Sequence, residues 1–287
     1  MTTTKRSTFG ATLRTTILMA TLGGLFVAIG FAIGGSQTAL LFLFFAALLN
    51  LGSYFFSDKI ALAMSRAKPI DESDNPRLYQ IVRELTTRAG LPMPRLYMIP
   101  SDQPNAFATG RSPKHSAVAV TRGISKLLSE DELRGVLSHE LAHVKHRDIL
   151  LQSVASTIGA AITYLGYMLL WFGGDDNNSP IGLAASLALV LLAPIAASLI
   201  QLSISRQREF AADAGGAEIC GNPESLASAL LRLEEGAKAM PMQVNPASEP
   251  LYIVKPFSGK GVANLFSTHP PIEERVRRLR QMRPSLG

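Results

Sequence analysis

The 287-residue sequence has little charge and almost no cysteine. Only 17% of its residues are charged and 47% are hydrophobic, whereas an ordinary soluble domain has about 25% charged residues. This composition excludes a surface that faces water on all sides. The single cysteine, Cys220, excludes a disulfide within the chain and agrees with a reducing compartment.

The hydrophobic residues are gathered into four long runs, which cover 13–33, 38–56, 149–172 and 181–204. Each run is near or above the roughly 20 residues that a helix needs to cross a bilayer at about 1.5 Å per residue. We therefore expect four transmembrane helices. A cleaved signal peptide is the alternative for the first run, but that run is long for one and a second run follows almost at once.

Basic residues are absent from the two short loops that join these runs, 34–37 and 173–180. All 28 lysines and arginines lie in the N-terminal segment, in 58–148 or in 205–287. The positive-inside rule therefore predicts that both termini and both large segments face the cytoplasm. The net charge of +6 suits an anionic inner leaflet and requires no nucleic-acid partner.

This topology divides the chain into four parts. Residues 1–57 form the N-terminal tail with the first two transmembrane helices, and residues 149–204 form the other two. Residues 58–148 and 205–287 are expected to form the two halves of one cytoplasmic domain, which is mainly α-helical with a small β-sheet.

Local signals predict the elements of the first half. Asn75 and Pro76 are typical of a helix start, and Gly90 predicts where that helix ends. Three short segments bounded by Pro, Gly and Asn predict the strands of the sheet: 95–99, 106–109 and 116–121.

A capping box of Ser129 and Glu132 begins the next helix, which we expect to continue directly into the hydrophobic run at 149. In the second half, one helix is expected to end near Gly221 and another to begin at Asn222. A last helix begins at the proline pair 270–271 and is basic along one side.

The sequence HELAH places His139 and His143 four residues apart, so both rings project from one helix face and can share a metal. Glu140 lies beside that face. The alternative is a pair of surface histidines on an amphipathic helix. A catalytic zinc site uses three protein ligands and leaves one position open, so a third ligand is expected elsewhere in the chain.

The third ligand is expected at the same height above the membrane as the histidine pair, and Glu209 meets this condition. His143 lies about 9 Å before the third run, and Glu209 lies about 7.5 Å beyond the fourth. Asp213, one turn after Glu209, is placed to accept the N–H of a ligand histidine and fix its tautomer. The alternative for Glu209 is a solvated helix charge beside Arg206 and Arg208.

This ligand set predicts peptide hydrolysis. Zinc activates a water, and Glu140 accepts its proton and passes it to the leaving amine. An extended substrate would bind by strand addition to the small sheet, with Asn105 and the strand at 106–109 as candidates. His269 is either an electrophile near the zinc or a packing residue.

Three motifs and the four hydrophobic runs together resemble the HtpX family of bacterial membrane-bound zinc metallopeptidases, which is related to the CAAX-prenyl endopeptidases. The motifs are SHELAHVKHRD, SRQREFAADAGGAEICGNPESLASALLRLE and FSTHPPIEERVRRL. The resemblance implies a zincin-like (gluzincin) fold and one zinc per subunit, held by His139, His143 and Glu209, with Glu140 as the catalytic base.

The resemblance also implies a multi-pass endopeptidase of the bacterial inner membrane. Its substrates would be misfolded or damaged membrane proteins, cleaved at the cytoplasmic face as part of stress response and protein quality control. The sequence gives no oligomeric state, cleavage preference or native metal beyond this.

Two other functions stay open. A structural zinc in a membrane scaffold or sensor is one, although it would not need Glu140 and the sequence offers no evident fourth ligand. A transporter is the other, although no charged residue lies deep in a run and Pro194 is the one proline within the runs.

Overall fold

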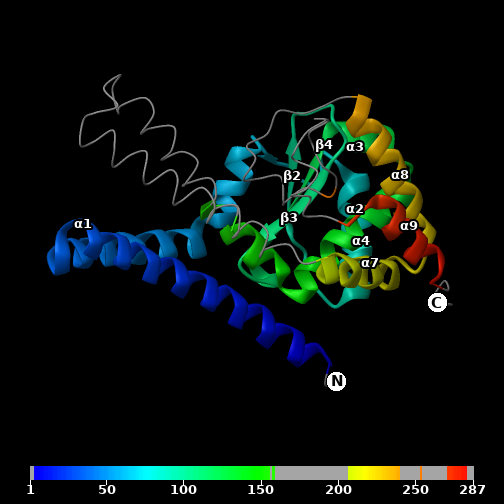
Figure 1. The fold of residues 1–287 in the computed structure, drawn as a ribbon. Coiled ribbons are helices and arrows are strands. Elements are labelled where there is room, and N and C mark those ends of the chain that lie inside the picture. The colour runs from blue at the N-terminus through cyan, green and yellow to red at the C-terminus, as the bar shows by residue number, and fades with distance from the viewer. Residues whose placement is uncertain (1–2, 156, 159–205, 240–252, 254–269, 283–287) are drawn as a thin grey trace.

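The computed structural model describes residues 3–155, 157–158, 206–239, 253 and 270–282. Over these residues the protein is mostly helical and contains one small mixed sheet, as the sequence predicts. A long helix, α1, projects from a folded body that contains the sheet and the other labelled helices (Figure 1).

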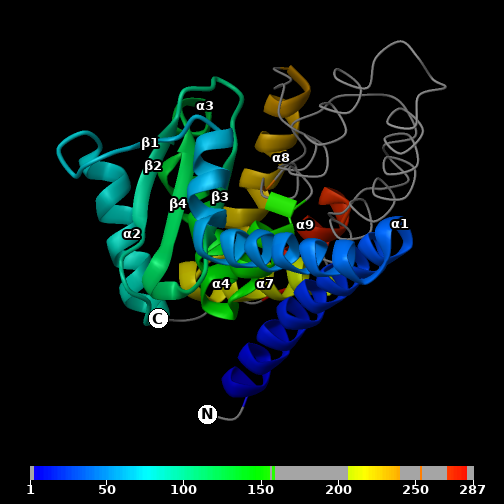
Figure 2. The same cartoon turned by 90° about the vertical axis from the view of Figure 1, so that its left-hand side faces the viewer.

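Helix α1, Thr3–Met64, doubles back on itself to form two arms (Figures 1 and 2). The change of direction falls at Gly35, whose φ of 68° lies in the left-handed region that glycine enters without steric cost. The side-chain amide of Asn50 donates to the carbonyl of Met19 at 3.1 Å and so joins the two arms. Gly35 lies within the predicted loop 34–37.

One segment among the described residues is long and apolar enough to cross a membrane: Gly35–Met64, with a mean hydropathy of 2.0. It contains the predicted second span, 38–56. The predicted first span, 13–33, is helical as part of α1. The third and fourth runs, 149–172 and 181–204, lie largely outside the described residues, so the arrangement of four spans stays a prediction.

The sheet has four strands in the order β1-β2-β4-β3. Strands β2 and β4 are parallel, while the β1–β2 and β3–β4 pairs are antiparallel. Three strands confirm the predicted segments and β1 was not predicted. Their bounds are β1 Lys68–Pro69, β2 Arg95–Ile99, β3 Ala106–Gly110 and β4 Ser116–Thr121.

Both faces of the inner sheet are buried, and each face packs on different helices. Ala108 and Val118 belong to the main hydrophobic core with residues of α2 and α4. Phe107 and Ala119 instead pack with Ala61, near the end of α1. Successive residues of a strand point to opposite faces, so this alternation holds the sheet between α1 and the other helices.

The two helices of the first half begin at the predicted caps. Helix α2, Pro76–Ala89, is capped by the side chain of Asn75, which accepts the N–H of Leu78. Helix α4, Glu130–His146, begins with the complete capping box of Ser129 and Glu132. The short elements η1 and α3, Pro113–His115 and Arg122–Leu127, were not predicted.

The prediction that the HELAH helix runs directly into the third hydrophobic run was wrong. Helix α4 ends at His146, because Arg147 adopts a left-handed conformation with φ 60° and its N–H bonds the carbonyls of His143 and Val144. Such a residue closes the last helical turn and changes the direction of the chain. Helical structure resumes at Asp148.

The described helices of the second half have ends that agree with the predicted starts and stops: α7 Arg206–Cys220, α8 Pro223–Ala239 and α9 Ile272–Arg280. Helices α7 and α8 pack against α4, and α9 packs against α7 and α8. Helix α7 crosses α4 very closely. A Cβ atom at Gly216 would lie 2.9 Å from the backbone N and Cα of His139. Glycine at this position therefore lets the two helices approach and brings their side chains together.

Candidate metal centre

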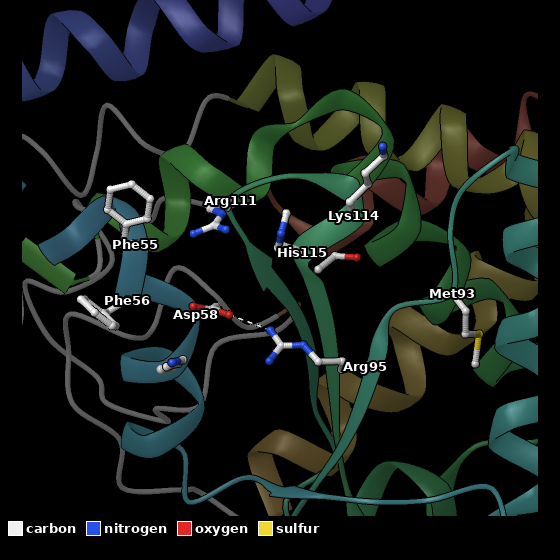
Figure 3. Close-up of a pocket in the computed structure, with 10 residues that line it drawn as sticks. Phe55, Phe56, Asp58, Met93, Arg95, Arg111, Lys114 and His115 are labelled. Atoms are coloured by element: carbon white, nitrogen blue, oxygen red, sulfur yellow. Dashed lines mark hydrogen bonds and ion pairs between the residues drawn. The ribbon is translucent and has the colours of Figure 1, made fainter. Parts of the chain in front are cut away.

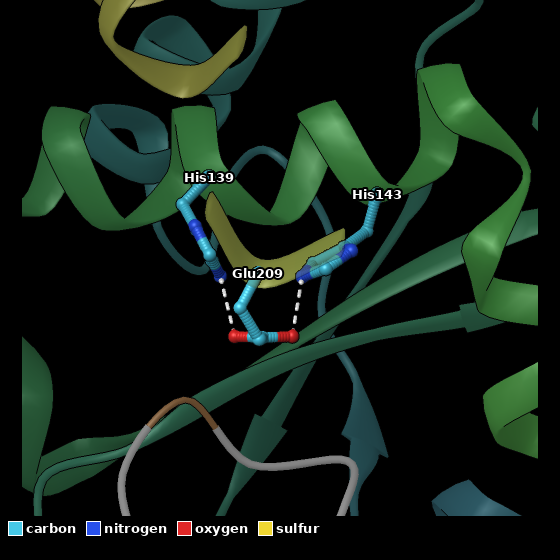
Figure 4. A group of neighbouring side chains, drawn as sticks. All are labelled: His139, His143 and Glu209. Atoms are coloured by element: carbon cyan, nitrogen blue, oxygen red, sulfur yellow. Dashed lines mark ion pairs between the residues drawn. The ribbon is translucent and has the colours of Figure 1, made fainter. Parts of the chain in front are cut away.

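His139, His143 and Glu209 meet at the crossing of α4 and α7 (Figure 4). One potential ligand atom from each lies within 4.8 Å of the others. The Nε2 atom of His139 is 3.8 Å from Oε2 of Glu209, and the Nε2 atom of His143 is 3.4 Å from Oε1. All three side chains are buried. The structure thus brings together the three residues that the spacing selected.

The helical geometry explains the arrangement. Residues four apart share one face of a helix, and the rings of His139 and His143 accordingly lie 4.7 Å apart between centroids. Glu209 occupies the first turn of α7 and faces both rings from the opposite helix. Two imidazole nitrogens and one carboxylate form a ligand set that suits zinc.

Each histidine also has a second carboxylate partner on its other ring nitrogen. Oδ1 of Asp213 lies 3.0 Å from Nδ1 of His139, one turn after Glu209 as expected. Oδ2 of Asp148 lies 3.5 Å from Nδ1 of His143, a contact that was not predicted and that follows from the change of chain direction at Arg147. Partners of this kind fix the tautomer that leaves Nε2 free to bind a metal.

Arg275 of α9 connects to this network and is fully buried. Its Nε and Nη2 atoms donate to the two oxygens of Asp213 at 2.9 and 2.7 Å, and Nη1 lies 3.9 Å from Oε2 of Glu209. The sequence motifs did not predict a role for this residue. A signal was present, because Arg275 shares the buried face of α9 with Val276 and Leu279.

Glu140 is buried beside the cluster and is bonded to the edge of the sheet. Its Oε2 atom accepts the backbone N–H of Ala108 at 2.8 Å. Burial raises the pKa of Glu140 to about 7, and the charge of Glu209 adds to that rise. A carboxyl group with a pKa near neutrality is suited to accept and return a proton at physiological pH.

Burial and the nearby charges together shift the pKa values of the two histidines in opposite directions. Burial lowers the pKa of His139 to about 4, and the nearby charges of Arg275 and His143 act in the same sense. Burial also lowers the pKa of His143, but Asp148 and Glu209 outweigh it and raise the pKa to about 10. The same carboxylates that stabilise a proton on His143 would attract a divalent cation.

Asp213 remains ionised although it is buried. Burial raises its pKa, but Arg275 and His139 outweigh that effect and lower the pKa to about 2. The pair of Asp213 and Arg275 therefore carries a fixed negative and a fixed positive charge next to His139.

The other two predicted site residues are placed differently. Asn105 is fully buried at the start of β3, where its side-chain oxygen accepts the N–H of Ala106 at 3.1 Å. Its side chain therefore holds the beginning of the edge strand. His269 lies outside the described residues.

The class of protein follows from this site. A histidine pair one turn apart, a glutamate from a second helix and a further buried glutamate beside them are the arrangement of a metallopeptidase of the His-Glu-x-x-His type. The comparisons with known proteins agree with this class.

The chain belongs to peptidase family M48, whose model matches residues 72–283. Over 276 residues it is 54% identical to a protease HtpX homolog of Pelotomaculum thermopropionicum, with 94% of this chain and 98% of that protein covered. A protease HtpX homolog of Syntrophobacter fumaroxidans is 52% identical over 281 residues, which cover 95% of this chain and all of the relative. These relatives confirm the resemblance drawn from the three motifs, and the protein is a metalloendopeptidase.

A solved structure shares the fold. The crystal structure of S. mikatae Ste24p matches with a TM-score of 0.51 and 19% identity, and the match covers 96% of this chain and 66% of that one. At this identity the match shows similarity of fold alone.

Proposed function

We propose that the protein is a zinc-dependent endopeptidase of the bacterial inner membrane that cleaves misfolded or damaged membrane proteins at the cytoplasmic face. In this proposal the chain crosses the membrane four times, both termini and the active site face the cytoplasm, and 58–148 and 205–287 form one catalytic domain. The contact between the edge of the sheet and Glu140 is the observation that carries the proposal.

His139, His143 and Glu209 are the proposed ligands of one zinc ion per chain. Their potential ligand atoms lie within 4.8 Å of one another, and the two carboxylates on the far ring nitrogens direct both Nε2 atoms inwards. Zinc bound there supplies Lewis-acid chemistry, which lowers the pKa of water to about 7 and polarises a peptide carbonyl.

Glu140 is the proposed general base and acid. Ala108 holds its Oε2 atom, which leaves Oε1 to accept a proton from the attacking water and return it to the leaving amine nitrogen. Its pKa of about 7 supports both steps, since the group then gains and loses a proton at little cost.

Asp213 and Arg275 act through His139. Asp213 accepts the Nδ1–H of His139, and Arg275 holds the carboxylate of Asp213 by two hydrogen bonds. Neither residue needs to touch the substrate. Their role is to fix the tautomer and the orientation of one metal ligand.

The substrate is proposed to bind as an extended strand along β3. This strand is the edge of the sheet, and Ala108 in its middle bonds Glu140, so a paired peptide would run past the catalytic carboxylate. The protein's own backbone makes one such hydrogen bond to this edge: the N–H of Ile253 donates to the carbonyl of Ala106 at 3.3 Å. Asn105 contributes by holding the start of the strand.

The proposal is tested by removing zinc from the full-length protein in detergent, restoring it, and following cleavage of an unfolded protein and of a membrane protein. Glu140→Gln is the matched variant, because it keeps the size of the side chain and the zinc ligands but removes the base. We expect zinc to restore cleavage in the wild type and not in Glu140→Gln, with equal zinc content in both.

Equal cleavage by Glu140→Gln would contradict the role of the base. Stoichiometric zinc without cleavage of any substrate by the wild type would instead favour a structural metal in a membrane scaffold or sensor. Cleavage of the unfolded soluble protein with no cleavage of the membrane protein would contradict the proposed substrate class.

A further inference from the structure

A pocket of about 560 Å³ lies at the end of α1 that meets the folded body (Figure 3). Its walls come from three parts of the chain: the end of α1, the segment that enters β2, and the turn between β3 and β4. The ten lining residues are Phe55, Phe56, Asp58, Lys59, Met93, Arg95, Arg111, Lys114, His115 and Ser116. None of them belongs to the metal centre.

The pocket is strongly basic. Of its four lysine and arginine side chains, only Arg95 has a carboxylate partner among the described residues, Asp58 at 2.6 Å. Lys59, Arg111 and Lys114 form no ion pair within the part of the chain that the structure describes. Among the described residues the pocket therefore presents three cationic groups without a carboxylate partner, which favours an anionic ligand.

Aromatic side chains from α1 complete the pocket. The guanidinium of Arg111 lies 5.2 Å from the ring centroid of Phe55, and the amine of Lys59 lies 5.4 Å from that of Phe56. Each cation thus rests near an aromatic ring while its charge stays available. A site that combines exposed aromatic rings with cations fits an amphipathic ligand better than a small inorganic ion.

The pocket lies where α1 leaves the predicted hydrocarbon layer. Residues 34–57 carry no charge, and Asp58 and Lys59 are the first charged residues after them. A hydrocarbon core of about 30 Å accommodates about 20 helical residues. The charged part of the pocket therefore falls at the level of the lipid headgroups.

An apolar stripe on α1 leads into the pocket. Phe44, Leu48, Leu51 and Phe55 follow one another at helical spacing and are 63%, 58%, 58% and 48% exposed. Phe55, the last of the four, is also a wall of the pocket. A molecule with long acyl chains and an anionic head would cover the stripe and the cationic groups at the same time.

We propose that this pocket binds an anionic phospholipid of the membrane, with its headgroup attracted by the cationic lining of Lys59, Arg111 and Lys114 and its acyl chains along the stripe on α1. The inference rests on the membrane placement proposed above for Gly35–Met64. It does not depend on which residues hold the zinc or on what the site cleaves.

The lipid would also fix the substrate strand relative to the bilayer. Arg111 directly follows β3, and Ala108, three residues earlier, is bonded to Glu140. A headgroup that holds Arg111 and Lys114 therefore holds the turn at one end of the strand on which we expect a peptide to pair. Anionic lipid would in this way set the height of the catalytic site above the membrane.

Native mass spectrometry of the full-length protein in detergent tests the proposal, with phosphatidylglycerol and phosphatidylcholine of identical acyl chains as probes. We expect phosphatidylglycerol to bind more tightly. The double variant Arg111→Gln with Lys114→Gln should weaken that binding about 25-fold, or about fivefold for each cation, and leave phosphatidylcholine unchanged. Charge-preserving exchange, Arg111→Lys with Lys114→Arg, should retain most of the binding and shows that the turn still folds.

Arg77→Gln with Lys126→Gln is the matched control, since it removes the same charge from exposed ion pairs outside the pocket. An equal loss of phosphatidylglycerol affinity in this control would show that the net charge of the protein, and not the pocket, determines binding. That result would overturn the proposal. Equal affinity for the two lipids would overturn it as well. Displacement of phosphatidylglycerol by millimolar inorganic phosphate would assign the pocket to free anions instead. None of these readouts uses cleavage, so they are independent of the proposed peptidase function.

Discussion

The buried arginine of α9 gives a prediction that the local sequence pattern alone would not suggest. Arg275 is fully buried and makes two hydrogen bonds to the carboxylate of Asp213, which is itself buried against His139. Replacing Arg275 by methionine keeps much of the side-chain volume but leaves a buried carboxylate without its cation. Breaking a buried ion pair in this way costs about 3–5 kcal/mol.

The expected loss is large relative to a total stability of about 5–15 kcal/mol. For a protein of this size it corresponds to a decrease in melting temperature of about 10 °C, measured on the metal-free protein in detergent. Because Asp213 would no longer be held for His139, zinc affinity should also fall about 10- to 100-fold. A chelator competition measures that change.

Arg278→Met is the matched control on the same helix. Arg278 is 46% exposed and pairs with Glu274, so its loss should cost about 1 kcal/mol or less. The double variant Arg275→Met with Asp213→Asn removes both charges and should recover part of the stability that Arg275→Met loses. If Arg275→Met is no more destabilising than Arg278→Met, or if it leaves zinc affinity unchanged, the reasoning about this pair is wrong.

Two further predictions concern protons and helix packing. In the metal-free protein at pH 7, His143 carries a proton because its pKa is raised to about 10, whereas His139, with a pKa lowered to about 4, carries none. Zinc needs neutral imidazoles, so its binding should release about one proton from His143, and the apparent affinity should fall about tenfold for each pH unit between the pKa of His143, about 10, and that of His139, about 4. Calorimetry in two buffers of different ionisation enthalpy measures this number, and a release near zero would contradict the assigned charge of His143. Gly216→Ala should force α7 away from α4, since the added Cβ would lie 2.9 Å from the backbone of His139, and should weaken zinc binding more than Gly215→Ala, whose Cβ would meet Ala142 Cβ at 3.2 Å. Equal effects of the two alanines on zinc affinity would contradict the role of the close crossing.

Much of the local structure was predictable because its causes are local. The cap at Asn75, the capping box at Ser129 and Glu132 and the short strands between proline, glycine and asparagine all depend on residues within a few positions of one another. The i, i+4 spacing of His139 and His143 belongs to the same group, since helix geometry alone puts both rings on one face.

The prediction that Glu209 meets the histidine pair agrees with the observed distances, but one of its premises failed. It assumed a continuous helix from α4 into the third hydrophobic run, whereas Arg147 breaks that helix. The two helices meet because Gly216 allows α7 to cross α4 closely. A left-handed residue other than glycine gives little sequence signal, so the break was not foreseen.

The contacts that were missed depend on how the chain folds beyond a single helix. Arg275 reaches Asp213 across 62 positions, and within its own helix it resembles the solvated arginines beside it. Asp148, five positions after His143, comes close to it because the chain changes direction at Arg147. Helix packing determines the first contact, and the left-handed conformation of Arg147 determines the second. Helical periodicity places Arg275 on the buried face of α9 but does not identify its partner.

The identity of the atoms that hold the metal is the central claim, and X-ray absorption at the zinc edge of the zinc-loaded full-length protein tests it most directly. We predict one zinc per chain with nitrogen and oxygen neighbours at about 2.0–2.2 Å, scattering from two imidazoles and no sulfur. Glu209→Ala should lose one oxygen neighbour, while Glu140→Gln should leave the spectrum unchanged. A sulfur neighbour at about 2.3 Å, or a spectrum that does not change in Glu209→Ala, would contradict the assignment of His139, His143 and Glu209 as the zinc ligands.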